Sequence, residues 1–285
     1  MNTQASPTRL IPAMEITEGA GVTVHRTIGT PALRNYDPFM LLDHFNSDDP
    51  DEYIAGFPSH PHRGFSTFTY MIDGQMEHQD SMGNTGNLGS GDAQWMKAGS
   101  GVIHSEMPKQ KDGLMRGFQL WINLPAINKM DMPEYQEFPS TDFPVIETID
   151  FNLKLLIGQF GDMQAPILDN ITQVSYFDVQ VKAGKNFQHA LPEENNSFLY
   201  VFEGDGQVNG QKIALHTLIA LGTDDNRADF LAGKQGARFV LISGKPINEP
   251  IVQYGPFVMN TRAEVDQAMR DFKSNNLVHN HGLKK

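Results

Sequence analysis

Two short segments of the chain each carry a pair of metal-binding side chain types separated by one residue. These segments are His60-Pro61-His62 and, later in the chain, His104-Ser105-Glu106. Residues i and i+2 of an extended backbone point to the same face, so each segment would present both of its ligands together. Two such strands lying side by side would bring three imidazoles and one carboxylate to a single point. The spacing therefore favours a β-fold in which these two strands are neighbours.

Glycines distinguish these two segments from the remaining histidines. Glycine is common where a backbone turns tightly or approaches a ligand closely, and both segments lie near such residues, at Gly56, Gly64, Gly99 and Gly101. A histidine without this context is more often a core or surface residue than a ligand. We expect that status for His25, His44, His78, His189, His216, His279 and His281. The residues predicted to bind one metal ion are His60, His62, His104 and Glu106.

The ligand types narrow the choice of metal. The chain has no cysteine, which excludes zinc sites built on thiolates and iron–sulfur clusters. Three neutral imidazoles and a carboxylate suit Fe(II), and they also suit Mn, Co, Ni, Cu and Zn, with the preference set by geometry and supply. Four protein ligands leave up to two positions of an octahedral ion for oxygen or an enolate-like substrate. The pattern indicates one divalent metal ion, with Fe(II) as the first choice.

Length and composition favour an all-β chain of two domains. The 285 residues suffice for one large or two ordinary domains. The chain has 26 glycines and 17 prolines, and helical patterns are scarce before its C-terminal end, which is typical of a β-protein rich in turns. Prolines recur between Pro125 and Pro144 and mark a boundary. We predict a metal-binding domain over residues 1–133, a linker over 134–146, a second domain over 147–250 and a tail over 251–285.

The two predicted domains resemble repeats of one another. The segment Phe68-Thr69-Tyr70-Met71-Ile72-Asp73-Gly74 aligns with Phe198-Leu199-Tyr200-Val201-Phe202-Glu203-Gly204 at an offset of 130 residues. At the same offset His60 falls on Ala190 and His62 falls on Pro192, neither of which can bind a metal. The second domain is therefore predicted to lack a metal and to have a structural or partner-binding role.

The strand signal over residues 117–124 alternates between two faces. One face carries Gln119, Trp121 and Asn123, and the other carries Phe118, Leu120 and Ile122. Either face could be interior, so Gln119 and Asn123 are candidates for the lining of a pocket as well as for ordinary sheet pairing.

The tail contains a helix signal. Thr261-Arg262-Ala263-Glu264 has the form of a capping box. Apolar residues follow at helical spacing, at Val265, Ala268, Met269 and Phe272. We predict a helix over residues 262–273 that buries this stripe on one of the two β-domains, with a role in packing.

The charge of the chain limits its partners. The formal net charge of −12 disfavours direct binding to nucleic acid or to an anionic membrane, since both require basic surface. Residues 1–7 show no signal peptide, and no uncharged stretch approaches the roughly 18 apolar residues of a membrane span. We expect a cytoplasmic protein, which agrees with the lack of disulfides.

Taken together, these segments resemble the cupin superfamily and, within it, the pirin family. The motifs that carry the resemblance are Asp37-Pro38-Phe39, Leu42-Asp43-His44-Phe45, His60-Pro61-His62-Arg63-Gly64-Phe65, Gly99-Ser100-Gly101-Val102-Ile103-His104-Ser105-Glu106, Gln119-Leu120-Trp121-Ile122-Asn123-Leu124-Pro125 and Gly255-Pro256-Phe257-Val258-Met259-Asn260-Thr261. The chain departs from the general cupin pattern at Thr67, where the usual glutamate is missing, and Glu106 supplies the carboxylate as it does in pirins. The resemblance implies a bicupin, in which two antiparallel, jelly-roll-like β-barrels pack face to face and only the N-terminal barrel holds iron.

The resemblance also implies an activity. Bacterial pirins act as quercetin 2,3-dioxygenases, which open the central ring of a flavonol with O2 and release carbon monoxide. The partners would then be a flavonol-like small molecule and O2, with Glu106 as metal ligand and general base. Candidates for an apolar pocket are Phe65, Phe68, Met96, Met107 and Trp121. Eukaryotic pirins suggest the alternative of an iron-dependent redox sensor or co-regulator that binds a protein partner, since a shared fold does not settle function.

Overall fold

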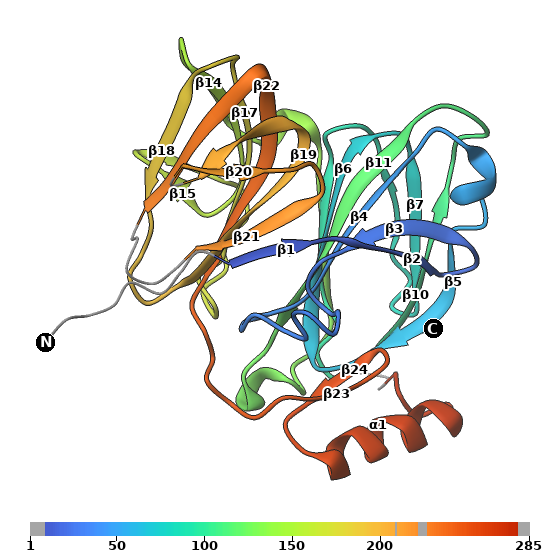
Figure 1. Ribbon diagram of the computed structural model, residues 1–285. Helices are drawn as coiled ribbons and strands as arrows, with labels where there is room; N and C mark the ends of the chain where they lie inside the picture. Colours follow the sequence, from blue (N-terminus) through green and yellow to red (C-terminus); the bar gives the residue numbers. More distant parts are fainter. Residues whose placement is uncertain (1–8, 209, 222–226, 279–285) are drawn as a thin grey trace, which may run out of the picture. The chain divides into compact units, whose positions relative to one another are not determined.

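The structure is a computed structural model that describes residues 9–208, 210–221 and 227–278. These residues form antiparallel β-sheets and one α-helix near the C-terminal end (Figure 1). The prediction of an all-β fold with a short C-terminal helix is confirmed. The chain divides into two compact units, the first barrel (residues 15–29, 39–140 and 247–285) and the second barrel (residues 1–14, 30–38 and 141–246). Residues 1–7, His279 and His281 lie outside the described residues.

The first barrel is built from two main sheets. A seven-stranded sheet has the order β12-β9-β6-β11-β4-β3-β2, a four-stranded sheet has the order β5-β10-β7-β8, and β23 pairs with β24. The strands are β2 Met14–Glu18, β3 Val22–Arg26, β4 Phe39–Ser47, β5 Phe57–His62, β6 Phe65–Asp73, β7 Met76–Asp80, β8 Thr85–Leu88, β9 Ala93–Lys97, β10 Val102–Pro108, β11 Met115–Asn123, β12 Glu134–Phe138, β23 Val252–Tyr254 and β24 Phe257–Met259. Short 3₁₀ helices cover Pro50–Glu52 and Ala126–Asn128.

The second barrel is one large sheet around an apolar core. Its order is β1-β21-β19-β22-β17-β14-β13, with β18 on β22 and β20 on β19, and β15 pairs with β16 separately. The strands are β1 Arg9–Pro12, β13 Val145–Glu147, β14 Phe151–Ile157, β15 Gln159–Phe160, β16 Met163–Gln164, β17 Ser175–Val181, β18 Asn186–Ala190, β19 Asn196–Val208, β20 Gln211–Ile213, β21 Thr217–Leu221 and β22 Arg227–Gly244, with a 3₁₀ helix at Ser140–Asp142. Its core includes Phe177, Leu199, Phe230 and Phe239, all fully buried.

The two barrels are not consecutive stretches of the chain. Strand β1 pairs antiparallel with β21, with Arg9 opposite Ala220, and therefore belongs to the second barrel (Figure 1). The expected linker 134–146 begins with β12, which extends the first barrel by pairing with β9, and ends in β13, which pairs with β14 of the second barrel. Most of this stretch is thus sheet structure.

The internal repeat has a structural counterpart. The segment that starts at Phe68 lies on β6, which pairs with β9 and β11. The segment that starts at Phe198 lies on β19, which pairs with β21 and β22. In both barrels the repeated segment is therefore a strand with a partner on each side, and most of its residues are buried.

Helix α1 covers Arg262–Lys273 and has the predicted capping box, in which Thr261 and Glu264 bond each other's backbone N–H. Val265 and Ala268 are buried, and Ala268 packs with Phe257 of β24 and with Leu277. Phe272 in the last turn remains 39% exposed, so the predicted stripe is buried only in part. Within the described residues, no helix is long and apolar enough to cross a membrane.

Candidate metal centre

The two predicted ligand segments are neighbouring antiparallel strands. His60 and His62 lie at the end of β5, and His104 and Glu106 lie on β10. His60 is directly opposite His104, and His62 is opposite Val102. Residues directly opposite each other in an antiparallel pair share a face of the sheet. The pairing therefore brings the three imidazoles together, as the i, i+2 spacing predicts.

The three rings form a compact cluster. Their centroids are 4.7 Å apart for His60 and His62, 4.4 Å for His60 and His104, and 4.9 Å for His62 and His104. One ring nitrogen from each lies within 4.8 Å of the others. The Nε2 atoms of His60 and His62 are 3.1 Å apart, and His60 Nδ1–H donates to the carbonyl of Pro58 at 2.8 Å. That bond leaves the Nε2 lone pair of His60 directed at the cluster.

The backbone near the cluster has no room for larger residues. Gly64 follows β5 with a φ of +91°, and a Cβ there would lie 2.0 Å from the carbonyl of Val258. Gly101 precedes β10 with a φ of +145°, and a Cβ there would lie 2.4 Å from the carbonyl of Leu277. Both positions combine left-handed backbone with close approach, which only glycine tolerates. The C-terminal segment therefore packs directly against both ligand strands.

Glu106 points toward a different neighbour from the one that strict alternation predicts. A register irregularity falls between His104 and Glu106 in the pairing with β5, and on the other side Glu106 lies opposite His78 of β7. Its carboxylate forms a second group of close ligand atoms with His78 and His104. The Thr69 hydroxyl lies 3.1 Å from Glu106 Oε1 and 2.6 Å from Gln119 Oε1. Because a hydroxyl has one proton, Thr69 can donate to only one of these oxygens at a time.

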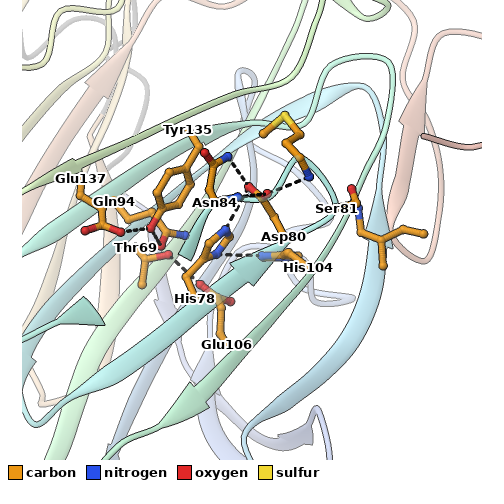
Figure 2. Close-up of polar contacts among 12 residues, drawn as sticks. Thr69, His78, Asp80, Ser81, Asn84, Gln94, His104, Glu106, Tyr135 and Glu137 are labelled. Atoms are coloured by element: carbon orange, nitrogen blue, oxygen red, sulfur yellow. Dashed lines mark hydrogen bonds and ion pairs between the residues drawn. The ribbon is translucent and has the colours of Figure 1, made fainter. Parts of the chain in front are cut away.

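His78 and Asp80 belong to the surroundings of the centre, although the sequence context of His78 predicted an ordinary core or surface residue. His78 is 1% exposed, and its Nδ1 lies 3.4 Å from His104 Nδ1 (Figure 2). Its Nε2–H donates to Asp80 Oδ2 at 3.3 Å, and its ring stacks on Tyr135 with 4.3 Å between centroids. Burial would raise the pKa of Asp80, but hydrogen bonds from His78, Asn84 and Met82 hold it below the ordinary value. The i, i+2 spacing of His78 and Asp80 was a signal that could have revealed them.

The electrostatics of the cluster suit a metal ion. Burial lowers the pKa of both His62 and His104 well below the ordinary value, and the neighbouring imidazoles lower each further. These rings are therefore neutral at pH 7, the form in which imidazole binds metals. His104 Nε2 is buried and has no hydrogen-bond partner among the described residues. A buried nitrogen lone pair without a partner is costly, so the donor set fits a divalent transition-metal ion.

A cavity of about 570 Å³ lies in the first barrel beside the cluster. His60, His62 and Glu106 line one part of it, and Gln119 and Trp121 of β11 line another. The wall also includes the charged residues Glu18, Arg26 and Asp43. Arg26 donates to both carboxylate oxygens of Asp43, at 2.6 and 2.5 Å, and pairs with Glu18 at 2.7 Å. The cavity thus combines an apolar wall, a candidate metal site and an ion-paired cluster.

Only some of the predicted pocket residues contact this cavity. Trp121 lines it, whereas Phe65 lies behind Trp121 with the two rings stacked at 4.4 Å. Phe68 and Met96 are fully buried, and Met107 is not part of the lining. Gln119 lines the cavity as expected, but Asn123 instead accepts a hydrogen bond from the buried Lys129 at 2.6 Å. Period-2 alternation gives the face of a residue but not its depth along the barrel.

In the second barrel, the strand that corresponds to the first ligand strand carries a single histidine, which packs among aromatic rings. His189 lies on β18, stacked on Phe160 with 5.0 Å between centroids, and edge-on to Phe177. Burial lowers its pKa. The described residues of this barrel contain no group of three His, Cys, Asp or Glu side chains close enough to hold a metal.

Two antiparallel β-barrels in one chain, with a histidine cluster in the first, define a bicupin. The pirin family model matches residues 21–122, and the model of the pirin C-terminal cupin domain matches residues 176–278. The chain belongs to the pirin family.

Individual relatives agree with this assignment. A Pseudomonas aeruginosa protein, provisionally named a quercetin 2,3-dioxygenase, is 46% identical over 264 residues, covering 90% of this chain and 92% of the relative. A crystal structure of quercetin 2,3-dioxygenase from Acinetobacter baumannii has a TM-score of 0.88 and 30% identity, covering 95% of this chain and 99% of that one. A bacterial pirin from Escherichia coli in complex with nickel(II) has a TM-score of 0.68 and 20% identity, covering 84% and 99%, and shares the fold.

Proposed function

We propose that the chain is a mononuclear non-haem iron dioxygenase that cleaves the central ring of flavonols of the quercetin type. The observation that carries the proposal is the placement of three converging imidazoles and the Glu106 carboxylate beside a cavity of about 570 Å³. That volume lies within the range of about 300–1,000 Å³ typical of small-molecule sites. The names of the relatives from Pseudomonas and Acinetobacter support the same substrate class.

The residues that would hold the metal are His60, His62 and His104, with Glu106 as the fourth ligand. Bound there, Fe(II) would supply Lewis acidity toward the flavonol 3-hydroxyl and one-electron chemistry toward O2. The neutral imidazoles keep the site from carrying excess positive charge before the ion arrives. His60 is fixed in the productive tautomer by the Pro58 carbonyl.

Glu106 is the proposed general base. Glu106 is 5% exposed and lines the cavity, so a 3-hydroxyl bound there would lie within reach of its carboxylate. The Thr69 hydroxyl lies 3.1 Å from Glu106 Oε1, and it would hold the carboxylate in one orientation when it donates there and not to Gln119. Trp121 presents its ring to the cavity and is backed by Phe65, which gives a flat aromatic substrate a rigid apolar wall. In the overall reaction one flavonol and one O2 give one ring-opened ester and one carbon monoxide.

Aerobic incubation of the Fe(II)-loaded protein with quercetin tests this function. We expect the flavonol absorbance to fade with release of carbon monoxide, and His62→Ala to abolish both. His189→Phe is the matched control, because His189 is a partly buried histidine of the second barrel whose ring packs against Phe160 and Phe177. Loss of turnover in His62→Ala alone supports the enzyme. Intact quercetin in the presence of fully loaded wild-type protein contradicts it and favours the iron-dependent regulator.

A further inference from the structure

A third i, i+2 pair lies beside the two that form the candidate metal centre. His78 and Asp80 are on β7, which pairs with β10 so that Glu106 is opposite His78 and His104 is opposite Asp80. Neither His78 nor Asp80 lines the cavity. Both are nonetheless linked to His104 by a short chain of contacts (Figure 2). A role for this pair must therefore act through His104 and not through contact with a substrate.

The hydrogen bonds around Asp80 determine which ring nitrogen of His78 carries a proton. Asp80 Oδ1 accepts from the backbone N–H groups of Met82 and Asn84, at 2.9 and 3.0 Å, and Oδ2 accepts from Asn84 Nδ2 at 2.8 Å. A carboxylate that accepts hydrogen bonds from three N–H groups is ionised and has no proton to donate. The contact of 3.3 Å between Asp80 Oδ2 and His78 Nε2 therefore requires the proton on His78 Nε2. In the neutral ring, Nδ1 of His78 is then a bare acceptor.

The tautomer of His78 in turn determines the tautomer of His104. His78 Nδ1 lies 3.4 Å from His104 Nδ1, so a bare His78 Nδ1 accepts from His104 Nδ1–H. A neutral His104 with its proton on Nδ1 has a free lone pair on Nε2. That atom is the one that is buried without a hydrogen-bond partner in the described structure. The chain Asp80, His78, His104 thus leaves His104 Nε2 available for a metal.

We propose that His78, fixed by Asp80 and by stacking on Tyr135, is a positioning residue that sets the tautomer and orientation of the metal ligand His104. This inference rests on the proposed metal centre. Partners of this kind on the far side of a ligating imidazole fix its tautomer and raise its basicity, and their loss typically costs about 10- to 100-fold in metal affinity. For His60 the backbone carbonyl of Pro58 has the corresponding position.

A direct bond from His78 to the metal is the competing interpretation, because His78, His104 and Glu106 form a second group of close ligand atoms. An ion between the facing Nδ1 atoms of His78 and His104 would use His104 Nδ1. The 3.4 Å between the two Nδ1 atoms fits either arrangement, but with an ion there His104 Nε2 would stay buried without a partner. The geometry therefore favours the hydrogen bond.

Two variants of His78 separate an acceptor role from a packing role. His78→Asn retains an oxygen near the position of Nδ1, whereas His78→Phe retains the ring that stacks on Tyr135 but has no acceptor. Co(II) affinity of the full-length chain, measured by competition with a chelator, is expected to fall about 10- to 100-fold in His78→Phe and to stay close to wild type in His78→Asn. His189→Phe, which also replaces a stacked histidine, is the control and should match wild type. His104→Ala gives the reference for loss of a true ligand.

The nitrogen-15 imidazole spectrum of the wild-type apoprotein tests the tautomer without any variant. We expect His104 to be protonated on Nδ1 and bare on Nε2, and His78 to be protonated on Nε2. The opposite tautomer of His104 overturns the proposal, as does Co(II) affinity in His78→Phe equal to wild type. A loss in His78→Asn as large as in His104→Ala also overturns it and makes His78 a ligand. None of these readouts depends on flavonol turnover. A chain that gives the expected results but leaves quercetin intact would refute the proposed dioxygenase activity and not the positioning role of His78.

Discussion

At the scale of single residues, Thr69 should matter for catalysis more than its neighbour Thr67 on the same face of β6. Thr69 bonds Glu106, whereas the hydroxyl of Thr67 is buried without a partner among the described residues. We predict that Thr69→Val lowers quercetin turnover at least about tenfold, because the Glu106 carboxylate loses a hydrogen bond that orients it. Thr67→Val should keep full turnover and gain about 1 kcal/mol of stability, because it removes an unsatisfied polar group. Equal turnover in the two variants would contradict the role of Thr69.

Asp43, in the wall of the cavity, should make stability fall as pH rises. Burial, only partly offset by hydrogen bonds from Arg26, raises the pKa of Asp43 from 3.8 to about 6. Between these values the folded chain binds more protons at Asp43 than the unfolded chain, so its contribution is complete below about pH 4 and is lost by about pH 6. Relative to Asp43→Asn, the wild type should lose up to about 3 kcal/mol over that interval in urea unfolding. A relative gain instead would show that pairing with Arg26 outweighs burial.

The candidate centre was predictable where its chemistry follows strand periodicity. His60, His62 and His104 could be placed together because i, i+2 spacing and flanking glycines are local features of the sequence. The neighbours of Glu106 were harder to predict. They depend on the register irregularity after His104, and no sequence pattern predicts that irregularity. His78 and Asp80 were not predicted to belong to the centre, because their place beside His104 depends on the pairing of β7 with β10, which brings together residues distant in sequence.

At the scale of elements, helix α1 should stabilise the first barrel through one buried ion pair. Arg63 follows directly after His62, is 1% exposed, and donates to Asp271 of α1 at 2.7 Å. We predict that Asp271→Ala costs about 2 to 3 kcal/mol, because it leaves a buried guanidinium without its charged partner. Asp266→Ala, which breaks the exposed pair with Arg262 on the same helix, should cost at most about 0.5 kcal/mol.

Tryptophan fluorescence during urea unfolding can measure this difference. Both tryptophans, Trp95 on β9 and Trp121 on β11, belong to the first barrel, so the signal reports on that barrel. Similar costs for the two aspartate variants would show that Arg63 does not depend on α1.

The sequence predicted α1 well and the ends of the barrels less well. The capping box and apolar spacing are local, and the helix has the expected bounds. Strand β1 pairs with residues 217–220 of β21, and a pairing of such long range is not set by the composition of residues 9–12. Prolines between residues 125 and 144 mark irregular backbone, but they do not prevent β12 and β13 from extending the two sheets.

At the scale of the whole molecule, the two barrels should respond differently to metal. Binding to the folded state alone stabilises it by about 2.7 kcal/mol at a concentration 100 times the Kd. We predict that Co(II) slows amide hydrogen exchange in β5, β7 and β10 of the first barrel and leaves β18 and β19 of the second barrel unchanged. Slowing of equal size in both barrels would contradict a single site.

One ion in the first barrel should be surrounded by His60, His62 and His104. Anomalous diffraction at the iron absorption edge, from crystals of the Fe(II)-loaded protein, tests it most directly. We expect one peak in each chain, at about 2.0 to 2.2 Å from a ring nitrogen of each of the three histidines. A peak at any other position, or a loaded crystal in which these three rings do not share an ion, would contradict it.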